Sequence, residues 1–199
     1  MNAAPAINPI ALFVASIFTS NILLANFLGM CSFISISKDI KSSNGLGMAV
    51  TVVLTVTSAI NWLILEYILI PLDLIYLRYI VFIIAIAAVV QILEMVIDRV
   101  SESLYMSLGI FLPLITVNCS ILGVALFIEI RSYTFIQSVL YGLGSGLGWW
   151  LAIMALSAIR KKTEKSKIPA ALQGPGITVI TIGFMAMAFL GFSGMVAVQ

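Results

Sequence analysis

Uncharged, mostly apolar stretches alternate with short charged segments along almost the whole chain. A helix needs about 20 apolar residues to cross the roughly 30 Å hydrocarbon core of a bilayer. The charge-free runs cover residues 1–37, 42–65, 79–93, 103–128, 132–159 and 168–199. We therefore expect six transmembrane helices. The third run is short, and it reaches the required length if its helix extends outward past Arg78, whose long side chain can reach the interface.

Composition supports a membrane location. Of the 199 residues, 62% are hydrophobic and 9% are charged, with a mean hydropathy of +1.18, whereas soluble domains carry about 25% charged residues. We expect an all-α integral membrane protein that forms a single domain over residues 1–199. The net charge of +2 is too small and scattered for a nucleic-acid partner. The segment 1–5 lacks the basic residues of a secretory signal, so we expect the first run to be retained.

Basic residues predict the orientation of the chain. Three of the five predicted loops hold eight of them, namely Lys38, Lys41, Arg99, Arg160, Lys161, Lys162, Lys165 and Lys167. The other two loops hold only Arg78 and Arg131. Because cytoplasmic loops carry the excess of Lys and Arg, we expect both termini on the outer, periplasmic side. The basic cluster at 160–167 could also contact anionic lipid or a partner, but a topology signal explains it without either.

The two halves of the chain, about 8–98 and 103–198, resemble each other. Leu28-Gly29 and Leu122-Gly123 each lie close to a cysteine, and Gly45-Leu46-Gly47 and Gly142-Leu143-Gly144 each stand where a following helix is expected to begin. Because each half has an odd number of spans, namely three, the two repeats would cross the membrane in opposite orientations. The sequence therefore predicts two inverted three-helix repeats, an arrangement that builds sites near the membrane midplane from discontinuous helices.

The first and fourth runs are expected to contain broken helices. As one straight helix, residues 1–37 would be about 55 Å long, well beyond the bilayer thickness. The run contains residues that are poor choices for a lipid-facing helix: Asn21, Asn26 and Gly29. The fourth run contains three of the same kind: Gly109, Pro113 and Asn118. Asparagine amides need partners, and interrupted backbone buried in protein supplies them.

The only two cysteines, Cys31 and Cys119, lie in these two runs, and the chain has no histidine. Free cysteine is most often a small, buried packing side chain. The alternative is a pair of thiolate ligands, because each cysteine occupies an equivalent place in its half and follows a helix-disrupting residue. Iron–sulfur clusters normally need four thiolates. The residues thus leave two interpretations open, packing or half of a metal site shared between two chains.

Two further clusters carry polar or small residues. Glu94, Asp98 and Glu102 are four residues apart, so one helix face would hold three carboxylates, either as a cation site or as a solvated helix end. In the fifth run, Gly142, Gly144, Gly146 and Gly148 are spaced for close helix packing rather than for a phosphate loop. The neighbouring Trp149 and Trp150, with Trp62, are expected to serve as packing or interface residues.

Several of these segments resemble one membrane-protein family, which comprises homologous subunits of sodium-translocating NADH:quinone reductases and Rnf complexes. The matching motifs are NFLGMC (Asn26–Cys31), QILEM (Gln91–Met95), LGIFLPLITVNC (Leu108–Cys119), GSGLGWW (Gly144–Trp150) and GFSG (Gly191–Gly194). The resemblance covers nearly the whole chain. It is strongest to the E subunits of the quinone reductase branch, and the A subunits of the Rnf branch are close relatives.

The resemblance implies a specific function. The chain would be a membrane component of a six-subunit bacterial inner-membrane enzyme that oxidises NADH, reduces ubiquinone and exports sodium. It would pair with a homologous D subunit of opposite orientation and share a [2Fe–2S] cluster with it, each chain giving two cysteines, here Cys31 and Cys119. Flavins and NADH would bind to other subunits. Glu94 matches an acidic position that the family uses in sodium uptake.

Three other functions remain open from the sequence. One is the related Rnf-type ferredoxin:NAD oxidoreductase. The second is a secondary transporter or channel subunit without a redox role, since inverted repeats and broken helices occur there too. The third is an assembly subunit without a cofactor.

Overall fold

The computed structural model describes residues 8–100, 115–166, 169 and 174–191, and these residues contain seven α-helices and no strands. The helices are α1 (Pro9–Ile17), α2 (Met30–Ile36), α3 (Ile40–Ile64), α4 (Arg78–Val100), α7 (Cys119–Ile130), α8 (Phe135–Thr163) and α9 (Pro175–Leu190). A π-helical turn, η1 (Leu65–Leu69), extends α3, and a short 3-10 helix, η2 (Ile75–Leu77), precedes α4. The predicted all-α chain is confirmed for this part of the sequence.

Three helical segments are long and apolar enough to cross a membrane: Ile40–Leu69, Ile75–Val96 and Phe135–Thr163. They correspond to the second, third and fifth predicted spans, although the last begins at Phe135 rather than at residue 132. Two shorter apolar helices, Cys119–Ile130 and Pro175–Leu190, lie in the fourth and sixth runs. Exposed side chains on α4 and α9 are large and apolar, including Ile84 and Phe184, which suits contact with lipid or with another membrane protein.

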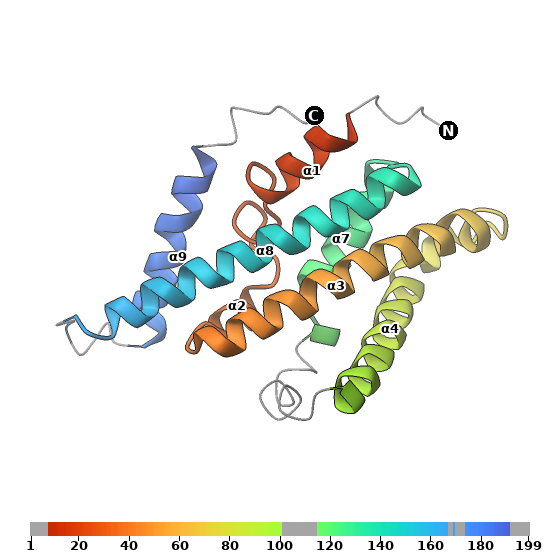
Figure 1. Ribbon diagram of the computed structural model, residues 1–199. Coiled ribbons are helices and arrows are strands. Elements are labelled where there is room, and N and C mark those ends of the chain that lie inside the picture. The colour runs from red at the N-terminus through yellow and green to blue at the C-terminus, as the bar shows by residue number, and fades with distance from the viewer. Residues whose placement is uncertain (1–7, 101–114, 167–168, 170–173, 192–199) are drawn as a thin grey trace.

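The helices α3 and α8 lie side by side at the centre, and α4 and α9 flank this pair on opposite sides (Figure 1). Gly142 and Gly146 of α8 face α3: a β-carbon on Gly146 would lie 2.7 Å from the Cα atom of Thr51. Gly144 and Gly148 face α1, where a β-carbon on Gly144 would lie 1.9 Å from Ser16 Oγ. The predicted packing role of these glycines is confirmed.

Polar residues fix the beginnings of the long helices. Asp39 caps α3, accepting hydrogen bonds from the Ser42 backbone N–H (3.0 Å) and hydroxyl (2.9 Å). Thr134 and Gln137 form a capping box at the start of α8. The Gly45-Leu46-Gly47 and Gly142-Leu143-Gly144 segments therefore lie inside α3 and α8, and the expectation that they open these helices is wrong. Side-chain caps upstream start both helices instead.

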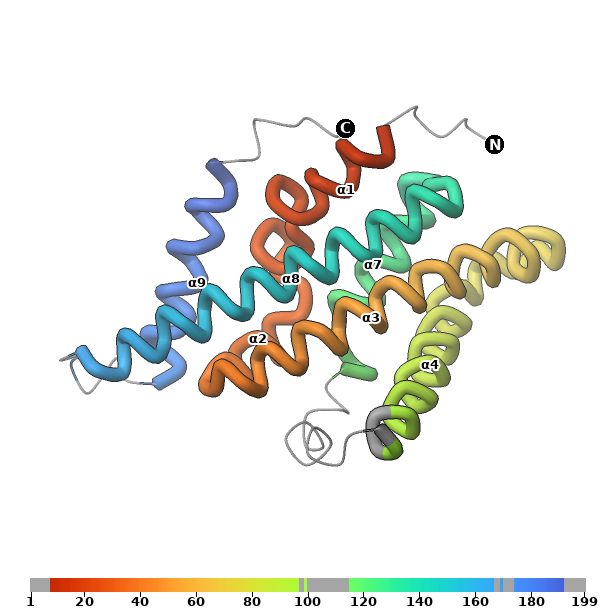
Figure 2. The backbone as a smooth tube through the Cα atoms, viewed as in Figure 1, coloured from red at the N-terminus to blue at the C-terminus, as the bar shows by residue number. Residues whose placement is uncertain are grey.

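The predicted interruption of the first run lies between α1 and α2, where residues 18–29 leave the helical path (Figure 2). The buried Asn21 side chain satisfies the freed backbone: its Nδ2 donates to Ile17 O (3.0 Å) and its Oδ1 accepts from Leu23 N (3.0 Å). In the fourth run, residues 115–116 are helical, 117–118 are not, and α7 begins at Cys119. Gly109 and Pro113 lie outside the described residues.

Side-chain hydrogen bonds join segments near the predicted loops at each of the two ends of the bundle. At one end, Arg160 of α8 donates to Ile34 O (2.9 Å) and Ser37 Oγ (2.7 Å), joining the end of α8 to the end of α2. At the other end, Trp62 Nε1 donates to Tyr133 O (2.9 Å), joining the end of α3 to the start of α8. Two of the three basic segments that the orientation argument grouped, those at Lys38 and at Arg160, thus lie at the same end.

Candidate cysteine site

Cys31 lies at the second position of α2, directly after a backbone feature that requires glycine. Gly29, the residue before α2, has a φ of 86°, a left-handed conformation that glycine adopts without steric cost. A β-carbon at Gly29 would also lie 2.0 Å from Ser120 Oγ. Both the backbone angle and the surrounding atoms therefore restrict this position to glycine, and they set the direction in which α2 and Cys31 leave the break.

Cys119 is the first residue of α7. Asn118 caps this helix, and its Oδ1 accepts a hydrogen bond from Ser120 N (3.1 Å). The N-terminus of a helix carries partial positive charge from its unpaired amide groups. The start of α7 therefore places partial positive charge beside the Cys119 sulfur.

The two cysteine segments contact each other across 90 residues of sequence. The Gly29 backbone N–H donates to Cys119 Sγ at 2.9 Å, and the Ser120 hydroxyl donates to Leu28 O at 2.8 Å. The sulfur of one half thus lies against the backbone two residues before the cysteine of the other. Gly29 thus supplies an amide hydrogen bond to the sulfur of Cys119.

Both thiols are free and exposed in this chain, although their surroundings are buried. Ser32, Asn118 and Ser120 are each at most 2% exposed. This finding contradicts the interpretation that each cysteine is a buried packing side chain. The chain fixes the backbone around each thiol with buried hydrogen bonds and leaves the thiol itself on the surface. Such an arrangement is typical of a site that another molecule completes.

The inner wall of the site is formed by Trp149 of α8. Its side chain is fully buried and packs edge-on against Phe33 of α2, with ring centroids 6.4 Å apart. Its Nε1 lies 3.0 Å from the place that a Gly29 β-carbon would occupy. Within the described residues, Trp149 Nε1 and Asn118 Nδ2 are buried donors with no acceptor. Trp149 therefore packs as predicted, and the wall presents N–H groups near the cysteine segments.

The residues present fit half of a thiolate-coordinated iron site. Two sulfurs, which are soft ligands suited to iron–sulfur centres, lie in contacting segments, and one accepts an amide hydrogen bond. Within the described ranges, no group of three or more His, Cys, Asp or Glu side chains could hold a metal ion. Two thiolates of the usual four are thus available from this part of the chain, and a second chain would have to provide the rest.

Glu94 lies on α4 with a half-buried side chain, and α4 packs against α3 and α7. It does not join the two thiols in a metal-binding group. Since α4 continues to Val100, the backbone places residues 94 and 98 on one helix face, as expected. The side chain of Asp98, and all of Glu102, lie outside the described residues, so the three-carboxylate cluster remains a prediction.

Sequence reasoning missed an ion pair between Arg78 and Glu129. It links the start of α4 to the end of α7, the helix that begins with Cys119. The Glu129 side chain is 12% exposed, and its second oxygen is buried without a partner in the described part of the chain. The available clue was that Arg78 and Glu129 carry opposite charges and border two predicted spans at the same end. The clue is weak, because many charges in such positions only contact water.

Comparison with known proteins identifies relatives over nearly the entire chain. Residues 10–196 match the family described as Rnf-Nqr subunit, membrane protein. The E subunit of the Na(+)-translocating NADH-quinone reductase of Chlamydia muridarum (strain MoPn / Nigg) is 49% identical over 200 residues, which cover 94% of this chain and 82% of the relative. The protein of the same name from Chlamydia trachomatis serovar L2 is 48% identical over the same shares of both chains.

Proposed function

The chain belongs to the Rnf-Nqr family of membrane subunits, and we propose that it is the E subunit of a sodium-translocating NADH:quinone reductase, an inner-membrane oxidoreductase with several subunits. The names and the extent of the similar chlamydial proteins support the quinone reductase branch over the Rnf branch. The long apolar helices support a multi-pass membrane location. On this proposal the chain is not an enzyme alone, and NADH and flavins bind to other subunits.

Within that complex, Cys31 and Cys119 hold one side of a [2Fe–2S] cluster, and a homologous D subunit holds the other side with two cysteines of its own. The observation that carries this proposal is the pair of exposed thiols on contacting segments with buried surroundings. When bound, the cluster supplies a one-electron relay inside the bilayer. Two chains are needed because this one offers two thiolates.

The residues of this chain position the thiols and adjust their electrostatic environment. The Gly29 N–H donates to Cys119 Sγ, which stabilises negative charge on the sulfur, and hydrogen bonds to ligand sulfurs are among the factors that set a cluster's potential. Asn118 fixes the start of α7, whose N-terminal partial charge acts in the same direction. Trp149 and Phe33 close the inner side against water.

We further propose six transmembrane segments in two inverted three-helix repeats, with both termini periplasmic. The first segment would be α1, its break and α2, and the fourth would end in α7. Support comes from the central pairing of α3 with α8, the second segments of the two halves, and from the flanking positions of α4 and α9, the third segments (Figure 1). Glu94 is assigned to the sodium pathway on the strength of its position in the QILEM motif.

The redox role is tested by removing both thiols from the intact complex. In the double variant Cys31→Ala and Cys119→Ala, we expect the iron bound by this pair of homologous chains and its EPR signal to disappear. Ser35→Ala is the matched control, because Ser35 is an exposed side chain one helical turn after Cys31. Full iron and an unchanged signal in the double variant would contradict the proposal and favour a transporter or an assembly protein.

A further inference from the structure

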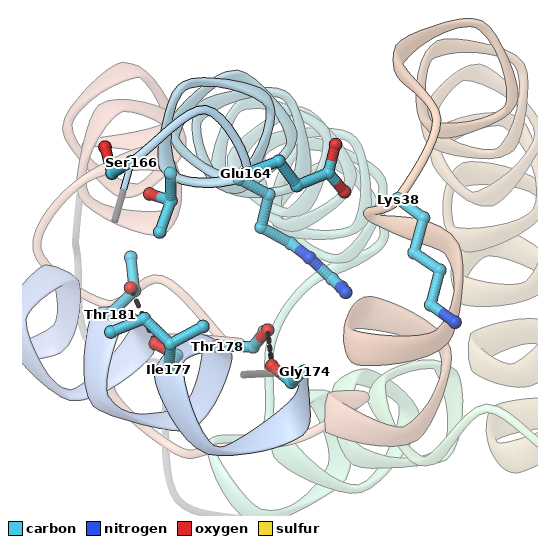
Figure 3. A pocket seen from close by; sticks show the side chains of 9 residues that line it. Lys38, Glu164, Ser166, Gly174, Ile177, Thr178 and Thr181 are labelled. Atoms are coloured by element: carbon cyan, nitrogen blue, oxygen red, sulfur yellow. Dashed lines mark hydrogen bonds between the residues drawn. The ribbon is translucent and has the colours of Figure 1, made fainter. Parts of the chain in front are cut away.

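A cavity of about 440 Å³ lies at one end of the bundle, between the end of α8, the start of α9 and the residues after α2. Its volume is within the range of small-ligand sites. Figure 3 shows Gly174, the residue before α9, and Ile177, Thr178 and Thr181 of α9 along one wall, with Lys38, Glu164 and Ser166 around the opposite side. Neither cysteine nor Glu94 is among the described residues that line it.

The charged groups at this cavity favour an anion. Among the described residues that line it, Lys38 and Arg160 stand against a single carboxylate from Glu164. Within the described residues, the one ion pair joins Arg78 to Glu129, so neither cavity cation is neutralised by a carboxylate there. Arg160 is held in place by the bonds from its Nη1 to Ile34 O and Ser37 Oγ. A fixed guanidinium beside a lysine is a suitable site for a phosphate group.

The hydroxyl groups at the cavity add acceptors rather than donors. Thr178 donates its proton to Gly174 O (3.1 Å) and Thr181 donates to Ile177 O (2.8 Å), as the dashed lines in Figure 3 mark. Thr163 likewise donates to Ile159 O (2.8 Å). Each oxygen keeps lone pairs that can accept a hydrogen bond. A ligand that carries hydroxyl donors as well as a phosphate satisfies both the cations and these oxygens.

One residue of the cavity wall, Ile177, also begins an apolar stripe along α9. Ile177 lines the cavity, and Ile180 and Phe184 follow it three and seven residues later, which places all three on one side of the helix. The Ile180 and Phe184 side chains are 43% and 65% exposed. The apolar segment containing α8 ends at Thr163, so the cavity lies where lipid headgroups meet the protein. Acyl chains can follow the stripe away from the cavity.

We infer that this cavity binds the headgroup of an anionic glycerophospholipid, such as phosphatidylglycerol. Its phosphodiester contacts Lys38 and Arg160, its glycerol hydroxyls donate to the threonine oxygens, and its acyl chains lie along Ile180 and Phe184. Basic pockets between transmembrane helices at a cytoplasmic surface commonly bind such headgroups. The site is independent of the proposed cysteine site, and its occupant would hold α9 to the end of α8.

The test is native mass spectrometry of the purified, delipidated complex after titration with phosphatidylglycerol, phosphatidylcholine or inorganic phosphate. We expect Lys38→Ala to weaken phosphatidylglycerol binding about tenfold at one site, because a charge-assisted hydrogen bond is lost. Lys38→Arg should restore binding. The matched control is Lys161→Ala, which removes the same charge from a neighbouring surface outside the cavity and should change affinity less than about twofold.

Three results would overturn the inference. An equal effect of Lys161→Ala would mean that the general charge of the segment attracts lipid. Equal binding of phosphatidylcholine would exclude selection of an anionic headgroup. Binding of inorganic phosphate without phosphatidylglycerol would identify a soluble phosphate ligand instead. Iron content measured on the same samples should stay unchanged, so failure of this inference is distinguishable from failure of the proposed function.

Discussion

The central pair α3–α8 and the two cysteine segments are built in opposite ways. The central pair consists of long continuous helices whose glycines allow close backbone approach, as between Gly146 and Thr51. The cysteine segments consist of interrupted backbone held by side-chain hydrogen bonds, and they expose both thiols. The pair is complete within one chain, whereas the cysteine segments form an exposed surface that, under the proposed function, a second chain completes.

The difference indicates how the fold supports the site. Trp149 belongs to α8 and also forms the inner wall behind Gly29. The close-packed pair therefore supplies the fixed surface against which the irregular segments are placed. Damage to the pair should disrupt the whole chain, whereas damage to the cysteine segments should affect iron first.

The largest effect is expected from overpacking the central pair. In Gly146→Val, the added carbons would meet the Thr51 backbone, and we expect a loss of about 3 kcal/mol or more in stability, because backbone cannot yield as a flexible side chain can. The measurement is the yield and thermal midpoint of the purified complex. Gly183→Ala on α9 is the control, since nothing lies within 4 Å of its added carbon. Equal thermal midpoints for the two variants would contradict the packing account.

A smaller but more local effect is expected at the cysteine segments. Gly29→Ala places a β-carbon 2.0 Å from Ser120 Oγ and forces an unfavourable φ, so the amide that donates to Cys119 Sγ should shift. We expect the midpoint potential of the iron centre to change, or iron to be lost, while the complex still assembles. Ser120→Ala alone, which removes the bond to Leu28 O, should lower stability by about 1 kcal/mol. An unchanged potential and iron content in Gly29→Ala would rule out the positioning role of this backbone.

A substitution of Glu94 distinguishes the proposed sodium pathway from the proposed redox site. If it takes part in sodium uptake, Glu94→Ala should reduce sodium-dependent turnover severalfold and leave the iron EPR signal intact, because α4 does not contribute to the thiol pair. Turnover is measured against sodium concentration in the assembled complex. Glu66→Ala, at the π-helical turn that extends α3, serves as a control for loss of a carboxylate. Sodium dependence equal to that of the wild type would remove Glu94 from the pathway.

The smallest effect is expected at the cap of α3. Hydrogen bonds from the Ser42 N–H and hydroxyl lower the pKa of Asp39 below its ordinary value, which is about 3.9. Its stabilising contribution is therefore full above that value and is lost as pH falls through the lowered pKa. Asp39→Ala should reduce stability by about 1 kcal/mol near neutral pH, and Asp39→Asn by less. Thermal midpoints measured at neutral and acidic pH check this. An equal loss of stability in Asp39→Ala and Asp39→Asn would contradict the capping role of Asp39.

Local features of the fold could be predicted from the sequence because their causes are local. Asn21 and Gly29 indicated an interruption, and the spacing of the α8 glycines indicated close helix packing. The sequence could not show that Gly142 and Gly146 meet α3 while Gly144 and Gly148 meet α1. That assignment depends on where three separate helices lie. The glycine pairs expected at helix starts were misplaced, because polar caps upstream determine where α3 and α8 begin.

The sequence was enough to select the two candidate cysteines, but it did not specify the geometry that surrounds them. Cys31 and Cys119 stood out as the only cysteines. The bond from Gly29 to Cys119 joins residues 90 apart, and no local pattern specifies it. The contact of Ser120 with Leu28 and the ion pair of Arg78 with Glu129 are equally non-local. Exposure of the thiols could not be inferred either, since both lie in apolar runs where burial is the usual state.

The most direct measurement is anomalous scattering at the iron edge from crystals of the intact complex. We expect iron within bonding distance of each of Cys31 Sγ and Cys119 Sγ, with two further sulfur ligands from the homologous chain. An absence of iron at these sulfurs, or sulfurs that face lipid with no second chain opposite them, would contradict the proposed iron site.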